Sequence, residues 1–151
     1  MFRAYAANNS TIGIARAWGG WEGPWELPSA PLFYGHAEDP FLWYQGSTRS
    51  YHALLHGLGG CGVGAAGVGC HAFSPDGYSW TLGAQPAYNL SVLLSDGSSA
   101  TFARRERPHL VMDPKTGAPT HLINGVQLPH GMQPPGGQGD YSYTIIVPLK
   151  T

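Results

Sequence analysis

The chain has 151 residues, the length of one ordinary domain with a core of its own. Charged residues make up only 11% and the formal net charge is −1, so the sequence carries no electrostatic footprint for nucleic acid or for an anionic membrane surface. Glycine (22), proline (13) and aromatic residues (12%) are frequent, which disfavours helices and favours turns and strands.

The predicted elements are short strands separated by turns. Asp96-Gly97 is typical of a β-hairpin turn, and Lys115-Thr116-Gly117 predicts a second turn. The stretch 128–140, rich in proline, glycine and glutamine, predicts a long surface loop. No window favours an amphipathic helix, so the predicted fold class is all-β. In chain order, the predicted strands lie within residues 11–17, 38–43, 51–57, 68–82, 88–94, 98–103, 106–111, 120–125 and 141–149.

A repeat organises these strands. Glu38-Asp39-Pro40 opens one apolar run and Glu106-Arg107-Pro108 opens another, and each run leads to a second apolar run that carries a histidine. A strand, a tight turn and a tryptophan precede the first copy at Trp25 and recur at Trp80. The recurrence exceeds the WD40 period of about 40–45 residues and is nearer to that of a larger propeller blade.

Asp39 and Glu106 are the candidates for paired carboxylate chemistry. Glycoside hydrolysis needs a protonated acid for the leaving oxygen and a further carboxylate that supports the charged transition state. A partly buried glutamic acid, or one that faces another carboxylate, keeps its proton near neutral pH. The alternatives are an ion pair of Glu106 with a neighbouring arginine and a turn-capping role for Asp39 before its proline.

Other polar and aromatic residues are candidates for sugar binding, although a strand histidine or a tryptophan is more often a core residue. The strand histidines either hydrogen-bond a sugar or are core residues, and most of the tryptophans are expected in the core. The stretch 74–80 is close to the Asp-box turn of sialidase-type propellers, one residue short, and predicts a structural turn. No cysteine–histidine spacing resembles a zinc site. The histidines and tryptophans concerned are His52, His56, His71, His121, Trp18, Trp21, Trp25, Trp43 and Trp80.

These motifs resemble the five-bladed β-propeller glycosidases, namely family 43 glycoside hydrolases and the related family 32 enzymes. In that family one blade opens with Asp-Pro, matched by Asp39-Pro40, and the next opens with Glu-x-Pro, matched by Glu106-Arg107-Pro108. The resemblance implies that Glu106 is the general acid and that Asp39 stabilises the transition state or tunes the pKa of the acid. The residues expected to bind the sugar are Trp43, His56, His71, Arg105 and Asn124.

The family pattern requires a third acid, an aspartate on the preceding blade, and no aspartate precedes Asp39. We therefore expect antiparallel four-stranded blades in an incomplete five-bladed propeller, forming one partial domain over 1–151. Residues 1–37 would end one blade, 38–104 would form the next, and 105–151 most of a third. The chain then reads as a partial glycosidase with weak or no activity alone, or as a non-catalytic carbohydrate-binding or scaffold propeller.

The remaining expectations concern partners, cofactors and compartment. No cofactor or metal ligand set is predicted, although the resemblance allows a cation on the propeller axis. The expected partner is a carbohydrate, with self-association through exposed blade edges. No apolar run reaches the roughly 18 residues of a membrane span, and the chain shows no signal peptide. The compartment stays open, with the extracellular or secretory route one alternative, and Cys61 and Cys70 are either disulfide-bonded or two thiols.

Overall fold

The computed structural model describes residues 1–6, 9–27, 32, 37–59, 67–129, 132 and 141–149, with the backbone only at 2–6, 9 and 10. Every strand pair in these ranges is antiparallel and they contain no α-helix, so the all-β prediction is confirmed. The strands are β1 Phe2–Ala6, β2 Asn9–Gly13, β3 Arg16–Ala17, β4 Trp25–Glu26, β5 Ala37–Gln45, β6 Ser50–Gly57, β7 Val68–Ser74, β8 Thr81–Leu82, β9 Ser91–Leu93, β10 Ser99–Thr101, β11 Arg104–Met112, β12 Pro119–Gln127 and β13 Ser142–Pro148.

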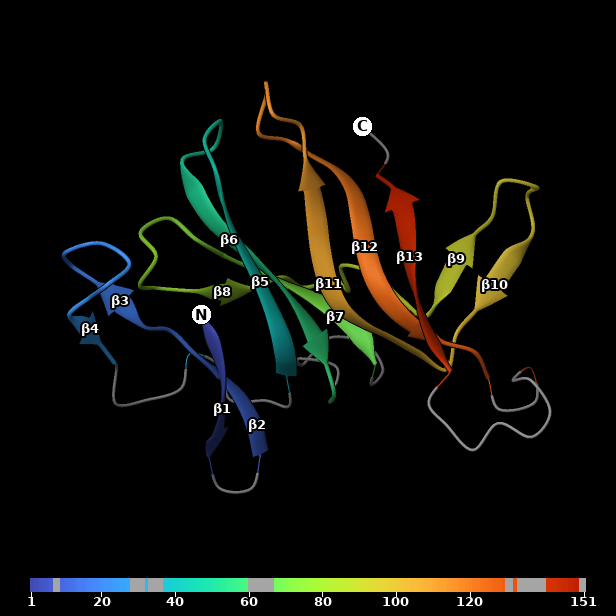
Figure 1. The fold of residues 1–151 in the computed structure, drawn as a ribbon, viewed down its shortest axis with the longest axis horizontal. Helices are drawn as coiled ribbons and strands as arrows, with labels where there is room; N and C mark the ends of the chain where they lie inside the picture. The colour runs from blue at the N-terminus through green and yellow to red at the C-terminus, as the bar shows by residue number, and fades with distance from the viewer. Residues whose placement is uncertain are drawn as a thin grey trace.

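Two sheets form the centre of the molecule (Figure 1). The first sheet has the strand order β5-β6-β7-β8, and the second has the order β11-β12-β13. Both are meanders in which each strand pairs with the next along the chain. The pairs β1–β2, β3–β4 and β9–β10 are separate two-stranded ribbons around them (Figure 1).

The sequence repeat is also a structural repeat. β5 pairs with β6 with a register shift between Glu38 and Phe41, and β11 pairs with β12 with a register shift between Glu106 and His109. A proline has no backbone N–H for the ladder, so a bulge at this step is expected. The equivalent residues are therefore Glu38 and Glu106, whereas Asp39 is equivalent to Arg107 rather than to Glu106.

The core consists of two clusters, one on each face of the first sheet. One face packs against the N-terminal segment, and the other packs against the second sheet. Complete burial of one such aliphatic side chain contributes about 1.5–3 kcal/mol. The buried members of the first cluster are Ile12, Ala37, Ala53, Leu55, Cys70 and Ala72, and those of the second are Leu54, Tyr88, Leu110 and Leu122.

Several predicted elements are confirmed and others need correction. The hairpin around Asp96 forms between β9 and β10, and β13 forms as the predicted last strand. The single strand expected over 11–17 is instead two short strands, β2 and β3, in different sheets. The predicted loop 128–140 lies outside the described residues except for 128, 129 and 132. The sheets are small, and the described residues form no closed propeller.

Three of the five tryptophans are not core residues, contrary to expectation. Trp18, Trp21 and Trp25 are exposed, because the β3–β4 ribbon is too short to bury them and stands apart from the central sheets. Cys70 in β7 is buried and disulfide-bonded, and Cys61 lies outside the described residues. Among the described residues no helix is long and apolar enough to cross a membrane.

Candidate functional site

The two acid–proline steps lie near the starts of β5 and β11, the first strand of each central sheet. Asp39 and Arg107 both have a φ of 51°, in the left-handed region that L-residues rarely adopt. A following proline disfavours this conformation further, because it restricts the preceding residue to extended backbone. The bulge and the left-handed residue together bring the side chains of Glu38 and Asp39 to the same place as His56 on β6.

Glu38, Asp39 and His56 form a compact group of three residues that could each bind a metal ion. Their carboxylate oxygens and imidazole nitrogen all lie within 4.8 Å of one another. His56 Nδ1 lies 3.2 Å from Glu38 Oε1, and both side chains are largely buried. Carboxylate and imidazole ligands suit a divalent cation, which would take its remaining ligands from water. The sequence analysis identified no such ligand set.

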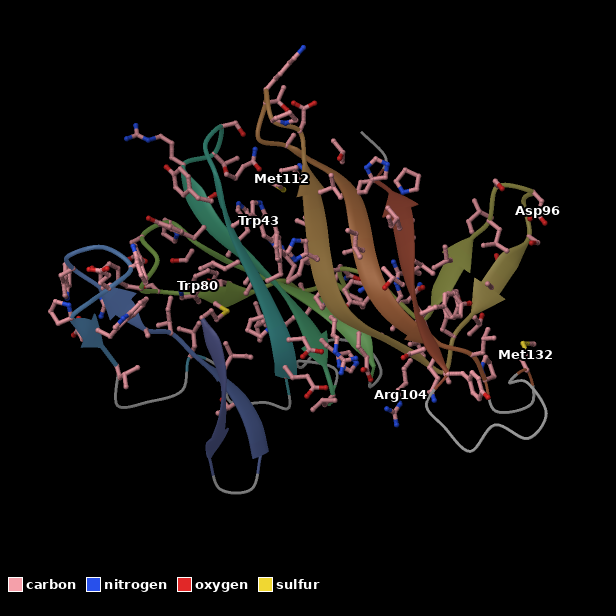
Figure 2. The ribbon with its side chains drawn as sticks, viewed as in Figure 1. Trp43, Trp80, Asp96, Arg104, Met112 and Met132 are labelled. Carbon is pink, nitrogen blue, oxygen red and sulfur yellow. The ribbon has the colours of Figure 1, made fainter. Side chains whose placement is uncertain are left out.

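In the second repeat, Glu106 makes ion pairs within its own strand. Its Oε2 accepts a hydrogen bond from Arg107 Nη1 at 3.0 Å, and its Oε1 lies 4.0 Å from Arg104 Nη1. Both arginines are exposed, and Figure 2 shows Arg104 at the lower end of β11, directed away from the sheet. The structural ion pair considered as the alternative for Glu106 is therefore present, with Arg107 rather than with Arg105.

Arg105 and Asn124 form a buried polar pair behind these carboxylates. Arg105 Nε donates to Asn124 Oδ1 at 2.9 Å, and its Nη1 donates to the backbone oxygen of Asn89 at 3.0 Å. Asn124 Nδ2 donates to the backbone oxygen of Glu106 at 3.2 Å. Burial lowers the pKa of Arg105, because removal from water disfavours the charged form. These hydrogen bonds hold the backbone of Glu106 in place.

Tyr88 is the residue on which these groups converge. Its ring covers Gly69, where a Cβ atom would overlap the ring, and Gly69 N–H donates to the backbone oxygen of Tyr88 at 2.8 Å. The guanidinium carbon of Arg105 lies 4.9 Å from the ring centroid. The side chain is only 7% exposed. Glycine at position 69 is thus what allows the tyrosine to lie between the two sheets.

The Tyr88 hydroxyl is buried and makes no hydrogen bond of acceptable geometry with the described residues. Burial raises its pKa strongly; Arg105 and the nearby Asn124 amide oppose this, and the charges of Asp39 and Glu106 add to it. Asn124 is thus close to the hydroxyl without completing a hydrogen bond. The charges of both candidate carboxylates therefore contribute to the pKa of one buried hydroxyl group. We call Tyr88, Asp39, Glu106, Arg105 and Asn124 the Tyr88 cluster.

A cavity of about 200 Å³ lies on the apolar side of the Tyr88 ring, between the two sheets. Trp43 and His71 line it together with leucines of both sheets, and Figure 2 shows Trp43 on the side of the first sheet that faces β11. His52 Nδ1 and His71 Nε2 are 3.0 Å apart, and their rings stack with an interplanar angle of 9°. Burial lowers the pKa of both histidines, and the charge of His52 lowers that of His71 further.

The seven predicted site residues occupy one region of the molecule. Four of them belong to the Tyr88 cluster, Trp43 and His71 line the adjoining cavity, and His56 contacts Glu38. Arg105 and Asn124 are both buried, and their side chains are hydrogen-bonded to each other. Sequence reasoning missed Tyr88, which is one of eight tyrosines and has no distinguishing motif around it.

The third carboxylate of the family pattern is not found among the other described aspartates. Asp76 and Asp113 each accept backbone N–H groups within turns, and Asp96 accepts the Ser98 hydroxyl and the Ser98 backbone N–H; these hydrogen bonds lower the pKa of each carboxyl. The predicted turn over Ser74–Trp80 is confirmed by these bonds. Comparison of the chain with family models, with curated proteins and with solved structures found no match.

Proposed function

We propose that the Tyr88 cluster is a glycoside-hydrolase-like site that binds a carbohydrate, with Glu106 as general acid and Asp39 as the supporting carboxylate. The observation that supports this proposal is that the charges of both carboxylates raise the pKa of one buried hydroxyl, that of Tyr88, which has no hydrogen-bond partner among the described residues. A hydroxyl-rich ligand offers the donors and acceptors that this hydroxyl lacks. Paired carboxylates next to such a ligand are the groups that glycoside hydrolysis requires.

The proposed roles follow from what each side chain contacts. The Glu106 carboxyl donates its proton to the glycosidic oxygen as the bond from that oxygen to the anomeric carbon breaks. Asp39 stabilises the positive charge that develops on the sugar ring. Asn124 holds the backbone oxygen of Glu106 at 3.2 Å, and Arg105 holds Asn124, so both are positioning residues.

We also propose that the two central sheets are successive propeller blades. One face of the first sheet packs against the second sheet, while its other face packs against the N-terminal segment, so packing continues in one direction along the chain. Each sheet begins with the same bulged acid–proline step. The acids of successive blades would then face a common axis, which is where propeller sites lie.

A measurement of binding tests the proposal. Wild-type protein is titrated calorimetrically with xylohexaose, cellohexaose and a fructo-oligosaccharide, and the titrations are repeated with Asp39→Asn and with Tyr88→Phe. We expect about tenfold weaker binding in each variant, because a charge-assisted or buried hydrogen bond is lost. Glu22→Gln, at an exposed position, is the matched control. Equal affinity in wild type and both cluster variants would remove the cluster from sugar binding.

The second candidate function is carbohydrate binding without catalysis. The 3.0 Å ion pair between Glu106 and Arg107 favours it, because this contact gives the carboxylate a structural role within its own strand. This candidate predicts that the double variant Asp39→Asn, Glu106→Gln still binds the oligosaccharides. It also predicts no turnover under any condition, whereas the hydrolase-like candidate predicts turnover that depends on Glu106.

A further inference from the structure

A second cavity lies on the opposite face of the first sheet. It measures about 270 Å³ and lies between the β3–β4 ribbon and the Ser74–Trp80 turn. Figure 2 shows Trp80 beside β8, on the side of the sheet toward β3 and away from β11. None of its lining residues belongs to the Tyr88 cluster. We call it the aromatic groove, and it is lined chiefly by Arg16, Trp18, Tyr51, Asp76, Tyr78 and Trp80.

The exposed aromatic rings of the groove are held in place by charged neighbours. Trp18 is 68% exposed, yet its indole Nε1 donates to Glu26 Oε2 at 3.2 Å. The same oxygen lies 3.5 Å from Arg16 Nη2, across the β3–β4 pair. The guanidinium carbon of Arg16 lies 3.7 Å from the ring centroid of Tyr78, a cation–π distance. The ring faces are therefore fixed before any ligand arrives.

The groove also offers both a hydrogen-bond donor and a hydrogen-bond acceptor. Arg16 Nε is buried and makes no hydrogen bond to the described residues. Asp76 Oδ1 accepts the backbone N–H groups of Tyr78 and Ser79 at 2.7 and 2.8 Å, which holds the carboxylate at the groove wall. The same oxygen also accepts the Ser74 hydroxyl at 3.0 Å. Trp80 Nε1 donates to the backbone oxygen of Gly77 at 3.1 Å, which fixes the Trp80 ring at the edge of the groove.

We propose that the aromatic groove is a second carbohydrate-binding site, separate from the Tyr88 cluster. A sugar ring presents an apolar C–H face to Trp18 and a rim of hydroxyls to Arg16 and Asp76, which matches fixed rings bordered by polar groups. The cavity volume is near the lower limit of about 300 Å³ for small-molecule sites, so it suits one or two sugar rings.

Other occupants fit less well. An apolar peptide or a lipid surface would take Asp76 and the Arg16–Glu26 pair out of water without replacing their hydrogen bonds, which costs several kcal/mol. A nucleic acid needs a basic patch, and here one arginine lies between two carboxylates. The inference does not depend on catalysis at the Tyr88 cluster, with which it shares only the ligand class.

The test is a titration of the whole chain with xylohexaose, cellohexaose and laminarihexaose. Binding is monitored through the NMR signal of the Trp18 indole N–H. This signal is assigned from its loss in Trp18→Phe. We expect the signal to shift and saturate with at least one oligosaccharide. Trp18→Ala should weaken binding about tenfold, measured on the remaining Trp80 signal. Arg16→Lys, which keeps a charge for Glu26 but loses the planar contact with Tyr78, should weaken it about threefold.

Two controls separate this site from its neighbours. Trp21→Ala removes a tryptophan that is 82% exposed and does not line the groove, and should leave the affinity unchanged. The double variant Asp39→Asn, Glu106→Gln should also leave the Trp18 titration unchanged, so failure of the proposed hydrolase-like site does not affect this result. The absence of any Trp18 shift with all three oligosaccharides would overturn the inference, as would equal weakening by Trp21→Ala and Trp18→Ala.

Discussion

Asp39 and Arg107 have the same φ of 51° and each immediately precedes a proline, at equivalent positions of the two repeats. A left-handed conformation costs an L-residue roughly 1–2 kcal/mol, and such residues persist only where the surrounding structure enforces them. At Asp39 this conformation brings a carboxylate beside Glu38 and His56. The geometry of the acid–proline step therefore creates the site and also carries a cost in stability.

The first prediction concerns that cost. Asp39→Gly should raise the free energy of unfolding by up to about 1 kcal/mol, because glycine adopts positive φ without a Cβ clash. It should also abolish sugar binding at the Tyr88 cluster. Urea denaturation measures the first effect and calorimetric titration the second. Arg49, with a φ of 53° in an exposed turn, provides the matched control: Arg49→Gly should stabilise the fold without altering binding. A destabilised Asp39→Gly variant would contradict the strain argument.

The second prediction concerns the contact between Gly69 and Tyr88. A Cβ atom at position 69 overlaps the tyrosine ring, so Gly69→Ala must displace the ring from between the sheets. We expect a loss of about 1–3 kcal/mol in the free energy of unfolding, the usual cost of overpacking. Gly46→Ala, where an added Cβ meets nothing within 4 Å, should change it far less. Similar losses in the two variants would show that the ring is not fixed there.

The third prediction concerns the buried pair of Arg105 and Asn124. In the first repeat the equivalent positions are Ala37 and Leu55, both buried and apolar. Asn124→Leu alone leaves the buried guanidinium without its partner and should cost about 2–3 kcal/mol. The double variant Arg105→Ala, Asn124→Leu copies the first repeat and should be less destabilised than the sum of its single variants, by about 1–2 kcal/mol. Additive losses would exclude coupling between the two side chains.

The fourth prediction concerns pH. Burial lowers the pKa of His52 and His71 from 6.5, so below this pH the folded state binds fewer protons than the unfolded state. The contribution of these histidines to stability is therefore complete above pH 6.5 and is lost as the pH falls through their folded-state pKa values. His71→Gln should flatten the fall in unfolding free energy between about pH 7 and pH 5. An unchanged slope in His71→Gln would contradict the assignment.

His121→Gln is the matched control for this experiment. His121 occupies the position in β12 that is equivalent to His52 in β6, but its ring stacks on neither His52 nor His71. The comparison therefore separates the loss of one histidine from the loss of the stacked pair. Urea denaturation at each pH measures all three proteins.

Much of the fold was readable from the sequence, because the features concerned are local. The Asp96-Gly97 turn, the last strand and the repeated acid–proline step each depend on a few neighbouring residues. The sequence alignment of the two steps places Glu38 opposite Glu106, and the register of the bulges confirms that these two residues are structurally equivalent. The bulge at the proline shifts the register of the strand pairing, and the alternation of apolar and polar residues does not reveal the size of that shift.

The centre of the site was not readable, because it depends on contacts between distant segments. Tyr88 belongs to the site only because Gly69, on another strand, leaves room for its ring. The exposure of Trp18 was likewise hidden, since composition favours tryptophan in a core and only the short β3–β4 ribbon explains its position. The burial of Arg105 was hidden as well, because it depends on a hydrogen bond to Asn124 on the neighbouring strand.

The most direct test of the hydrolase-like site replaces the third carboxylate with formate. Benzyl furanosides and pyranosides are suitable substrates, because their alkoxide leaving group needs a proton. Water attacks the anomeric carbon and gives its proton to formate, while Glu106 gives its proton to the departing oxygen. We predict release of benzyl alcohol that rises with formate concentration in wild type and in Glu22→Gln and is lost in Glu106→Gln. Benzyl alcohol release that does not change with formate concentration, or that is equal in wild type and Glu106→Gln, would contradict the proposed function.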